Sequence, residues 1–435
     1  MDEYVCQPAC GPIDAVVRVP GSKSITNRAL VTAALADGHS LLTNVLLAAD
    51  TRLMIDALRS LGIAVTVDSV GPHLEITGCG GHLPLSEAKL FCGNAGTVMR
   101  FGAAMVATGH GLFELDGVQR MRERPIAHLV DALRSLGAGL EYLDREGYPP
   151  IRVHASGLRG GEIVLEAPPS SQFVSALMLA APCAANDVLI EVVGPVPSVP
   201  YLSMTTSVMD RFGVGVIEQR NAEGIRFIIA APQRYAGCTF AVEPDASNAT
   251  YFLAAAAVAG GRVVLEGLGE RSIQGDARFV DVLERMGCSI VREPHRLTVS
   301  RPDTGKALHG IDVDLNDMPD TVQTLAVVAL FADGPTTIRN VANLRVKETD
   351  RIAALATELA KLGATVEQRP DGLTIHPPTN LTAAVLDTYD DHRMAMSLAL
   401  AGLGCPGCVI RDPGCCGKTF PDFFERWDRL AGPSS

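Results

Sequence analysis

The sequence predicts a mixed α/β fold built from six copies of one unit, arranged as two domains of three units. One observation is a helix-and-glycine pattern that recurs about every 75 residues. A second is an apolar helix that recurs out of phase with that pattern. Short β-branched runs between the helices supply the strands. With 435 residues, the chain is long enough for two or more ordinary domains.

The first recurring element is an amphipathic helix that ends in a hydrophobic residue and a glycine. Its five copies end at Gly62, Gly137, Gly213, Gly287 and Gly363, which lie 75, 76, 74 and 76 residues apart. Glycine directly after a helix commonly adopts the left-handed conformation that stops the helix. The spacing therefore predicts five helix stops at equivalent places of a repeated unit.

The second recurring element is an alanine-rich helix that is apolar nearly all round. It has six copies, at residues 27–36, 98–108, 173–181, 249–258, 322–332 and 393–403. A helix without a polar face is expected to lie in the core. These six helices are therefore predicted to be buried.

Strands are predicted where β-branched runs are bounded by turn residues. Examples are residues 65–67, 151–153, 163–165, 227–229, 262–265 and 297–299. The sixth unit is incomplete at the C-terminus of the sequence, and we expect residues 1–19 to complete it.

The composition argues against several classes of partner. The net charge is −12, which disfavours nucleic acid and anionic membranes. No run of about 18 apolar residues appears, so no membrane-spanning helix is expected. The acidic first residues carry no signal-peptide or transit pattern, and the eleven scattered cysteines indicate reduced thiols. We therefore expect a cytoplasmic protein that acts on small molecules.

The start of the first apolar helix suggests an anion site. Residues 20–30 read PGSKSITNRAL, in which Ser22 or Ser24 can cap the helix. Lys23 lies in the first turn, where a cation opposes the helix dipole, and Arg28 can face the same way. Free backbone N–H groups at a helix start also favour an anion. A solvated lysine and a surface arginine are the plainer alternative.

The other apolar helices also begin with polar residues. Most of these residues are ordinary helix caps, and they lie at 94–97, 170–172, 245–248, 317–321 and 390–393. Capping does not explain Arg100 and Arg393, which oppose the dipole as Lys23 does. A polyanion shared by the helix starts would explain all three.

Two further stretches are unusually charged. Residues 120–125 place three arginines within five positions, and residues 343–351 hold five charged side chains. On a helix, Lys347 and Arg351 would be like-charged neighbours, which is unfavourable unless an anion lies between them. Solvated charge runs are the alternative for both stretches.

Taken together, these motifs resemble the family of 5-enolpyruvylshikimate-3-phosphate synthases, or 3-phosphoshikimate 1-carboxyvinyltransferases. The matching runs follow the family order over nearly the whole chain: 20–28, 93–100, 120–125, 169–172, 319–320, 345–351, 391–396 and 418–422. No single motif is specific, but the ordered set is.

The resemblance implies an inside-out fold of two domains, each with three βαβαββ-type repeats around buried helices. The domains would be residues 21–240, and residues 1–20 with 241–435. The buried helices would point their N-termini into a cleft between the domains, and substrate would close that cleft.

The reaction that the resemblance implies transfers enolpyruvyl from phosphoenolpyruvate to the 5-hydroxyl of shikimate 3-phosphate and releases phosphate. Shikimate 3-phosphate would be held by Lys23, Ser24, Arg28, Ser170, Ser171, Gln172, Ser198, Tyr201, Asp320, Asn343 and Lys347. Phosphoenolpyruvate would be held by Lys23, Asn94, Gly96, Arg124, Gln172, Arg351, Arg393 and Lys418. Asp320 would be the base, and Glu348 with Lys23 would transfer protons at the enolpyruvyl group. No metal or organic cofactor is implied, and we expect a monomer.

The chain departs from the family pattern at two places. Phe101 stands where many relatives have proline, and Val199 where some have lysine. The resemblance also implies that the herbicide glyphosate occupies the phosphoenolpyruvate site beside Gly96, and Phe101 on the same helix could shift that glycine.

Two alternative functions remain open from the sequence. UDP-N-acetylglucosamine enolpyruvyl transferases share the fold and the donor, but typically use a loop cysteine, and here no cysteine lies between Cys92 and Cys183. A non-catalytic anion-binding scaffold would not need Asp320 and Glu348 together with the full cationic set.

Overall fold

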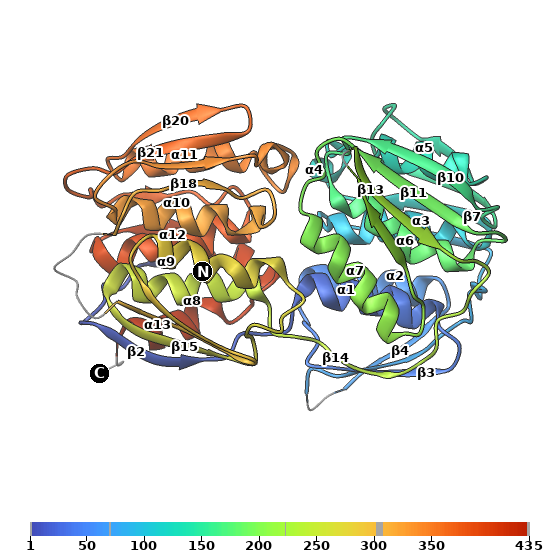
Figure 1. Cartoon of the computed structure of the whole chain (residues 1–435), viewed down its shortest axis with the longest axis horizontal. Coiled ribbons are helices and arrows are strands. Elements are labelled where there is room, and N and C mark those ends of the chain that lie inside the picture. Colours follow the sequence, from blue (N-terminus) through green and yellow to red (C-terminus); the bar gives the residue numbers. More distant parts are fainter. Residues whose placement is uncertain (1, 69–70, 222, 302–307, 433–435) are drawn as a thin grey trace. The chain divides into compact units, whose positions relative to one another are not determined.

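The computed structural model describes residues 2–68, 71–221, 223–301 and 308–432, and it divides the chain into two compact units (Figure 1). The first unit is Gly21–Val242, and the second unit combines Met1–Pro20 with Glu243–Ser435. In each unit the helices lie inside and the strands lie outside (Figure 1).

The first unit contains three four-stranded sheets with one shared topology. In the order given below, the first and second strands of each sheet pair in parallel. The second pairs with the third, and the third with the fourth, in antiparallel fashion. The sheets are β6(Glu87–Phe91)-β7(His110–Asp116)-β9(Ile151–Ser156)-β8(Gly139–Tyr142), β10(Gly161–Glu166)-β11(Val188–Val193)-β13(Gly224–Ile229)-β12(Ile217–Arg220), and β14(Thr239–Ala241)-β3(His39–Thr43)-β5(Leu74–Thr77)-β4(Ala64–Val67).

The helices of the first unit fall into two classes. Three are buried nearly all round: α1(Lys23–Leu35), α3(Gly96–Ala107) and α6(Ser171–Ala180). Three are amphipathic: α2(Ala49–Ser60), α5(Ala127–Ser135) and α7(Val199–Arg211). The short α4(Gln119–Arg122) and η1(Ala181–Cys183) complete the set among the described residues.

The second unit repeats the arrangement. Its sheets are β16(Ser289–Glu293)-β17(Arg296–Arg301)-β15(Gly261–Glu266)-β2(Ile13–Val17), β18(Asp312–Asp314)-β19(Thr336–Arg339)-β21(Gly372–His376)-β20(Thr365–Arg369), and the three-stranded β1(Glu3–Val5)-β23(Val409–Arg411)-β22(Val385–Leu386). The buried helices are α8(Ala246–Ala259), α10(Val322–Val328) and α12(His392–Gly404). The others are α9(Phe279–Arg285), α11(Arg351–Lys361) and α13(Phe423–Ala431), with 3-10 turns η2(Gly275–Arg278), η3(Pro319–Thr321), η4(Ala329–Phe331), η5(Ala342–Val346) and η6(Pro413–Lys418).

The repeat predicted from the sequence is confirmed as a two-domain α/β architecture of six similar units. The order β6-α3-β7-α5-β8-β9 is one βαβαββ repeat, and β10 to β13 form the next. Positive φ angles of 82° to 104° confirm the five predicted helix stops at Gly62, Gly137, Gly213, Gly287 and Gly363. Since the left-handed conformation strains residues with a Cβ, glycine suits these stops.

One detail differs from the sequence prediction. Residues 1–19 do not all complete the sixth repeat, because only β1 pairs with β23 there. The second strand, β2, instead runs parallel to β15 in the fourth repeat. In the same way, β14 at the end of the first unit runs parallel to β3 near its start. Strands distant in sequence therefore complete repeats at both chain crossings, which a linear scan for repeats does not detect.

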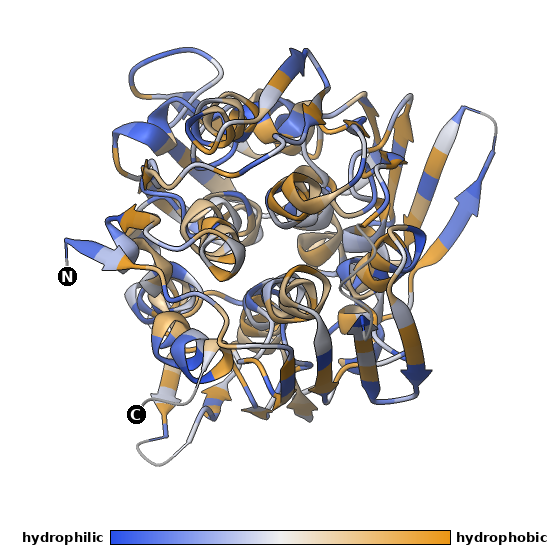
Figure 2. Cartoon of the chain, turned by 90° about the vertical axis from the view of Figure 1, so that its left-hand side faces the viewer, coloured by the Kyte–Doolittle hydropathy of each residue, from blue (hydrophilic) through white to orange (hydrophobic). Residues whose placement is uncertain are grey.

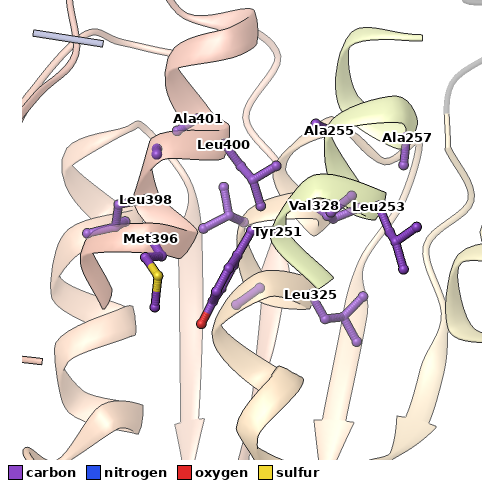
Figure 3. Packing of buried hydrophobic residues seen from close by; sticks show 14 of the residues in the cluster. Tyr251, Leu253, Ala255, Ala257, Leu325, Val328, Met396, Leu398, Leu400 and Ala401 are labelled. Carbon is purple, nitrogen blue, oxygen red and sulfur yellow. The ribbon is translucent and has the colours of Figure 1, made fainter. Parts of the chain in front are cut away.

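The core of the second unit lies between α8, α10 and α12. Tyr251, Leu325 and Leu400 project from these three helices into one cluster (Figure 3). The four alanines 254–257 of α8 are fully buried, so neighbouring backbones can approach closely. Figure 2 shows hydrophobic colouring on the helices and alternating colours along the outer strands. Among the described residues, no helix is long and apolar enough to cross a membrane.

Candidate active site

The first helix of the first unit presents a lysine that is paired inside that unit. Ser22 caps α1 by accepting a hydrogen bond from the backbone N–H of Ile25, at 3.5 Å. Lys23 is the first residue of α1, and its Nζ lies 3.3 Å from Oδ2 of Asp50. Asp50 is buried in the first turn of α2. Sequence analysis missed Asp50 because an acid at a helix start is an ordinary residue there.

Arg28 is buried and engaged by the protein. Its guanidinium donates hydrogen bonds of 2.8–3.2 Å to oxygens on α1, α6 and α7, which belong to Ser24, Ser175, Tyr201 and Thr205. It also lies 5.3 Å from the ring centroid of Phe101 on α3. Burial lowers the pKa of Arg28 to about 10, so the side chain still carries its charge at neutral pH. Arg28 therefore connects four helices of the first unit, α1, α3, α6 and α7.

The start of α3 gathers four of the predicted phosphoenolpyruvate residues. Arg124 Nη1 donates to the carbonyl and Oδ1 of Asn94, at 3.0 and 3.2 Å. A Cβ on Gly96 would lie 2.7 Å from Arg124 Nη2 and 2.8 Å from Gln172 Oε1. Arg100 is held separately, because its Nη2 donates to the carbonyl of Pro125 at 3.0 Å. Glycine at position 96 is therefore what leaves room for these polar groups.

The remaining predicted residues of the first unit start α6 and α7. Ser170 caps α6 through a 3.2 Å hydrogen bond from the backbone N–H of Gln172, and Ser171 is the first residue of that helix. Ser198 directly precedes α7. It is buried from solvent, and its backbone adopts the left-handed conformation, with φ of 59°. Tyr201 lies in the first turn of α7. A non-glycine residue in this conformation marks a locally constrained backbone.

Asp320 is the centre of the charged cluster in the second unit. Its Oδ1 lies 3.0 Å from Arg351 Nη1 and 3.7 Å from Lys347 Nζ. Its Oδ2 lies 2.9 Å from Arg393 Nη2. The carboxylate sits in η3, directly before the buried helix α10, while the three cations come from the segment after η5, from α11 and from α12.

Lys347 and Arg351 are not neighbours on one helix. The turn η5 ends at Val346, and α11 begins at Arg351, because Asp350 caps α11 with a 3.0 Å hydrogen bond from the backbone N–H of Ala353. The two cations converge on the same oxygen of Asp320. The anion that the sequence required between them is thus supplied by this carboxylate.

Glu348 bridges two further cations. Its Oε2 lies 2.9 Å from Arg351 Nη2, and its Oε1 lies 3.3 Å from Lys418 Nζ at the end of η6. Asn343 lies in η5, and its Oδ1 accepts no hydrogen bond from any described residue. Asp320, Glu348 and their four cations are therefore connected by ion pairs of 2.9–3.7 Å.

Asp391 contacts two of the cationic residues of this cluster, Arg351 and Arg393, and the sequence did not reveal this role. It is fully buried and caps α12, where its Oδ1 accepts from the backbone N–H of Arg393 at 2.9 Å. Its Oδ2 accepts from Arg351 Nε at 2.7 Å. A buried carboxylate requires such partners, because desolvating an unpaired charge is costly.

A second buried carboxylate, Asp276, was also missed. It lies in η2, and Ser247 Oγ donates a hydrogen bond to its Oδ2. Burial, and then the negative charge of Asp320, raises its pKa to about 7. Asp276 precedes no apolar helix, so the pattern that identified the other sites could not find it.

Each unit thus carries a cluster of polar side chains, some of them at the starts of its buried helices and the others on neighbouring segments. The second unit combines the cations Lys347, Arg351, Arg393 and Lys418 with carboxylates that share them. Guanidinium and ammonium groups suit phosphates and carboxylates, and the carboxylates can transfer protons. The first unit adds Lys23, Arg124 and several hydroxyl and amide groups. These are the parts needed for chemistry on anionic substrates.

Comparisons with known proteins agree with this chemistry. Residues 9–427 match the family model described as EPSP synthase (3-phosphoshikimate 1-carboxyvinyltransferase). A 3-phosphoshikimate 1-carboxyvinyltransferase from Nostoc punctiforme is 48% identical over 419 residues, which cover 96% of this chain and 97% of that protein. One from Photobacterium profundum is 47% identical over the full length of both chains. A chloroplastic one from Petunia hybrida is 47% identical, and the match covers 97% of this chain and 84% of that protein.

The fold is also similar to solved structures. EPSP synthase from Acinetobacter baumannii superposes with a TM-score of 0.80 at 25% identity, over 99% of this chain and 98% of that chain.

Proposed function

The chain belongs to the EPSP synthase family, and on that premise we propose how its residues carry out the reaction of that family. The enzyme transfers the enolpyruvyl group of phosphoenolpyruvate to the 5-hydroxyl of shikimate 3-phosphate and releases phosphate. The product belongs to the shikimate pathway of chorismate and aromatic amino-acid biosynthesis. The chemistry requires a base for the hydroxyl, a proton for the enol carbon, and cations for two phosphates and two carboxylates.

Shikimate 3-phosphate would be held from both units. In the first unit, helix starts supply N–H and hydroxyl groups that suit a phosphate. In the second unit, Asp320 and Lys347 would take the hydroxyl end of the ring. The assigned residues are Lys23, Ser24, Arg28, Ser170, Ser171, Gln172, Ser198, Tyr201, Asp320, Asn343 and Lys347. Arg28, with four protein acceptors already, would mainly hold the site in shape.

Phosphoenolpyruvate would use the remaining cations. Arg351, Arg393 and Lys418 pair with carboxylates of the second unit, and the phosphate and carboxylate of the substrate would replace some of those contacts. Gly96 leaves space beside Arg124 and Gln172 for the same molecule. The full set is Lys23, Asn94, Gly96, Arg124, Gln172, Arg351, Arg393 and Lys418.

The observation that carries this mechanism is the position of Asp320 among three cations. Each cation favours the ionised form of the carboxylate and weakens it as a base. When phosphoenolpyruvate takes N–H groups of Arg351 and Arg393, that stabilisation falls and Asp320 becomes a better acceptor for the 5-hydroxyl proton. The base would therefore become active when both substrates are present.

Glu348 and Lys23 would transfer protons at the enolpyruvyl group. Glu348 forms ion pairs with Arg351 and Lys418, and Lys23 forms an ion pair with Asp50. Since these two residues belong to different units, the reaction needs the two units to close on the substrates. We propose that the two units are the two enolpyruvyl-transferase domains, and that shikimate 3-phosphate favours their closed arrangement. A monomer suffices for this scheme, and eleven free thiols suit the cytoplasm.

The choice of acceptor tests the function directly. Phosphate release is measured with phosphoenolpyruvate and either shikimate 3-phosphate or UDP-N-acetylglucosamine as acceptor. We expect turnover with shikimate 3-phosphate only. Release with the nucleotide sugar would transfer the chain to the other enolpyruvyl transferases, and release with neither would leave an anion-binding scaffold.

A further inference from the structure

A strained turn leads into the buried helix α12. Tyr389 and Asp390 both adopt the left-handed conformation, with φ of 56° and 54°. One non-glycine residue in this region is uncommon, and two in succession persist only where the surroundings hold them. The backbone N–H of Asp391 donates to the carbonyl of Thr388 at 2.9 Å, which closes the turn.

The group that holds this turn is Glu358, whose side chain is fully buried on α11. Its Oε1 accepts a 2.6 Å hydrogen bond from the hydroxyl of Tyr389. Its Oε2 accepts from the backbone N–H of Asp387 at 2.9 Å and lies 2.7 Å from Lys361 Nζ. One carboxylate thus holds Asp387, the residue just before the turn, and Tyr389, one of its two left-handed residues. Burial, and then the hydrogen bond to Glu358, raises the pKa of Tyr389 to about 12, so its hydroxyl stays a donor.

The same helix carries the arginine that the turn serves. Arg351 is the first residue of α11, and Glu358 follows seven residues later, two turns along the same face. Glu358 fixes the turn, and the turn delivers Asp391 to Arg351 Nε at 2.7 Å and to the backbone N–H of Arg393 at 2.9 Å. Through the turn and Asp391, Glu358 is therefore connected to the guanidinium of Arg351 and to the backbone N–H of Arg393.

We propose that Glu358 and Tyr389 are positioning residues for enolpyruvyl transfer: they lock the turn so that Asp391 aims Arg351 and Arg393 at phosphoenolpyruvate. This inference rests on the proposed function, in which those arginines bind that substrate. Neither Glu358 nor Tyr389 would touch substrate. A purely structural role would instead lower stability and leave the two substrates equally affected.

The test removes only the tyrosine hydroxyl. In Tyr389→Phe, Glu358 keeps its contacts to Asp387 and Lys361, so the fold should survive. Losing one hydrogen bond should loosen the turn and raise the KM for phosphoenolpyruvate about threefold to tenfold. The KM for shikimate 3-phosphate should stay within about twofold, a range too small to indicate a lost hydrogen bond. Glu358→Gln should raise the KM for phosphoenolpyruvate further, because its amide cannot accept from all three donors.

The matched control is Tyr4→Phe. The hydroxyl of Tyr4 also donates to a carboxylate of the second unit, that of Asp428, but away from the turn. It should lower the melting temperature at least as much as Tyr389→Phe does, because Tyr4 is buried and Tyr389 is not, and it should leave both KM values unchanged. If Tyr389→Phe behaves like this control, or raises both KM values equally, the positioning role is wrong.

A third variant separates this inference from the proposed function. Arg393→Lys should raise the KM for phosphoenolpyruvate whether or not the turn matters, because lysine cannot make the same paired contacts. If Arg393→Lys raises that KM and Tyr389→Phe does not, only the positioning role is overturned. If Arg393→Lys leaves it unchanged, the assignment of the arginines to phosphoenolpyruvate is wrong.

Discussion

Arg351 Nη1 lies 3.0 Å from Oδ1 of Asp320, in an ion pair that joins the proposed base, whose side chain is 15% exposed, to a buried arginine proposed to bind substrate. The pair means that the base and the donor site are not independent. Any substrate group that takes N–H groups from the guanidinium also changes the basicity of the carboxylate.

Lys23→Met should nearly abolish turnover. The ammonium group is proposed to contact both substrates and to take part in proton transfer, so its loss should cost about 1.5–3 kcal/mol in binding and on the order of 10²–10⁴ in rate. The measurement is kcat and both KM values from phosphate release. Lys89→Met is the control, because Lys89 is an exposed lysine of the same unit that also pairs with a carboxylate. Activity of Lys23→Met within threefold of wild type would contradict the role.

Gly96→Ala should weaken ligands of the phosphoenolpyruvate site. The new Cβ would lie 2.7 Å from Arg124 Nη2 and 2.8 Å from Gln172 Oε1, so these side chains must shift. Overpacking of this kind costs about 1–3 kcal/mol, or roughly fivefold to more than a hundredfold in affinity. Glyphosate, as the longer molecule, should lose more than phosphoenolpyruvate does. Inhibition constants and KM values measure the two effects.

Gly102→Ala is the matched control for that prediction. It lies on the same helix, but its Cβ would meet only leucine side chains, at 3.3 Å or more. It should therefore leave both constants nearly unchanged. Wild-type resistance to millimolar glyphosate would show that Phe101, buried against Arg28, has reshaped the pocket and that Gly96 does not face the inhibitor.

Asp276 should make stability depend on pH. Burial, and then the charge of Asp320, raises its pKa from 3.8 to about 7 in the folded protein. The folded state binds this proton more tightly than the unfolded state does. The stabilisation that protonation of Asp276 gives the folded protein is therefore complete below about pH 4 and is lost as pH rises through 7. The loss is on the order of 4 kcal/mol at most.

Asp276→Asn should therefore gain stability relative to wild type as pH rises from 5 to 8. Melting temperatures across that range measure the difference. Asp281→Asn, at an exposed aspartate on the neighbouring α9, should show no such trend. A difference between Asp276→Asn and wild type that stays constant with pH would mean that Asp276 is ionised throughout.

Shikimate 3-phosphate should reduce the radius of gyration of the protein. The proposed contacts to that ligand come from both units, so binding favours an arrangement in which the two units approach. Small-angle scattering with and without the ligand makes the comparison. An unchanged radius, with binding confirmed by calorimetry, would contradict closure.

The sequence predicted the repeats well because each repeat carries its own signal. A helix stop such as Gly62 or Gly363 needs only a local left-handed residue, and α3 or α12 is buried because its own residues are apolar on every face. The exchange of β2 into the fourth repeat depends on pairing with β15, far away in sequence, and no local pattern encodes it.

The candidate site was predictable to the extent that residues violate a local rule. Lys23 and Arg393 oppose a helix dipole, so they attract notice. Their partners Asp50 and Asp391 occupy ordinary first-turn and capping positions, so only their burial and contacts reveal them. Glu358 was invisible for another reason: an acid in an amphipathic helix is expected to be exposed, and its burial depends on a turn about thirty residues later.

The most direct test of the account is the turnover number of Asp320→Asn at saturating shikimate 3-phosphate and phosphoenolpyruvate. Asparagine keeps the shape of the side chain but cannot accept the hydroxyl proton. The matched control is Asp317→Asn. Asp317 is an exposed aspartate three residues before Asp320 in the chain, and it pairs with Arg278. The account predicts that kcat of Asp320→Asn falls on the order of 10²–10⁴ while both KM values change far less, and that the control stays near wild type. A kcat near wild type for Asp320→Asn, with only the KM values raised, would show that Asp320 binds substrate and that the base is another group.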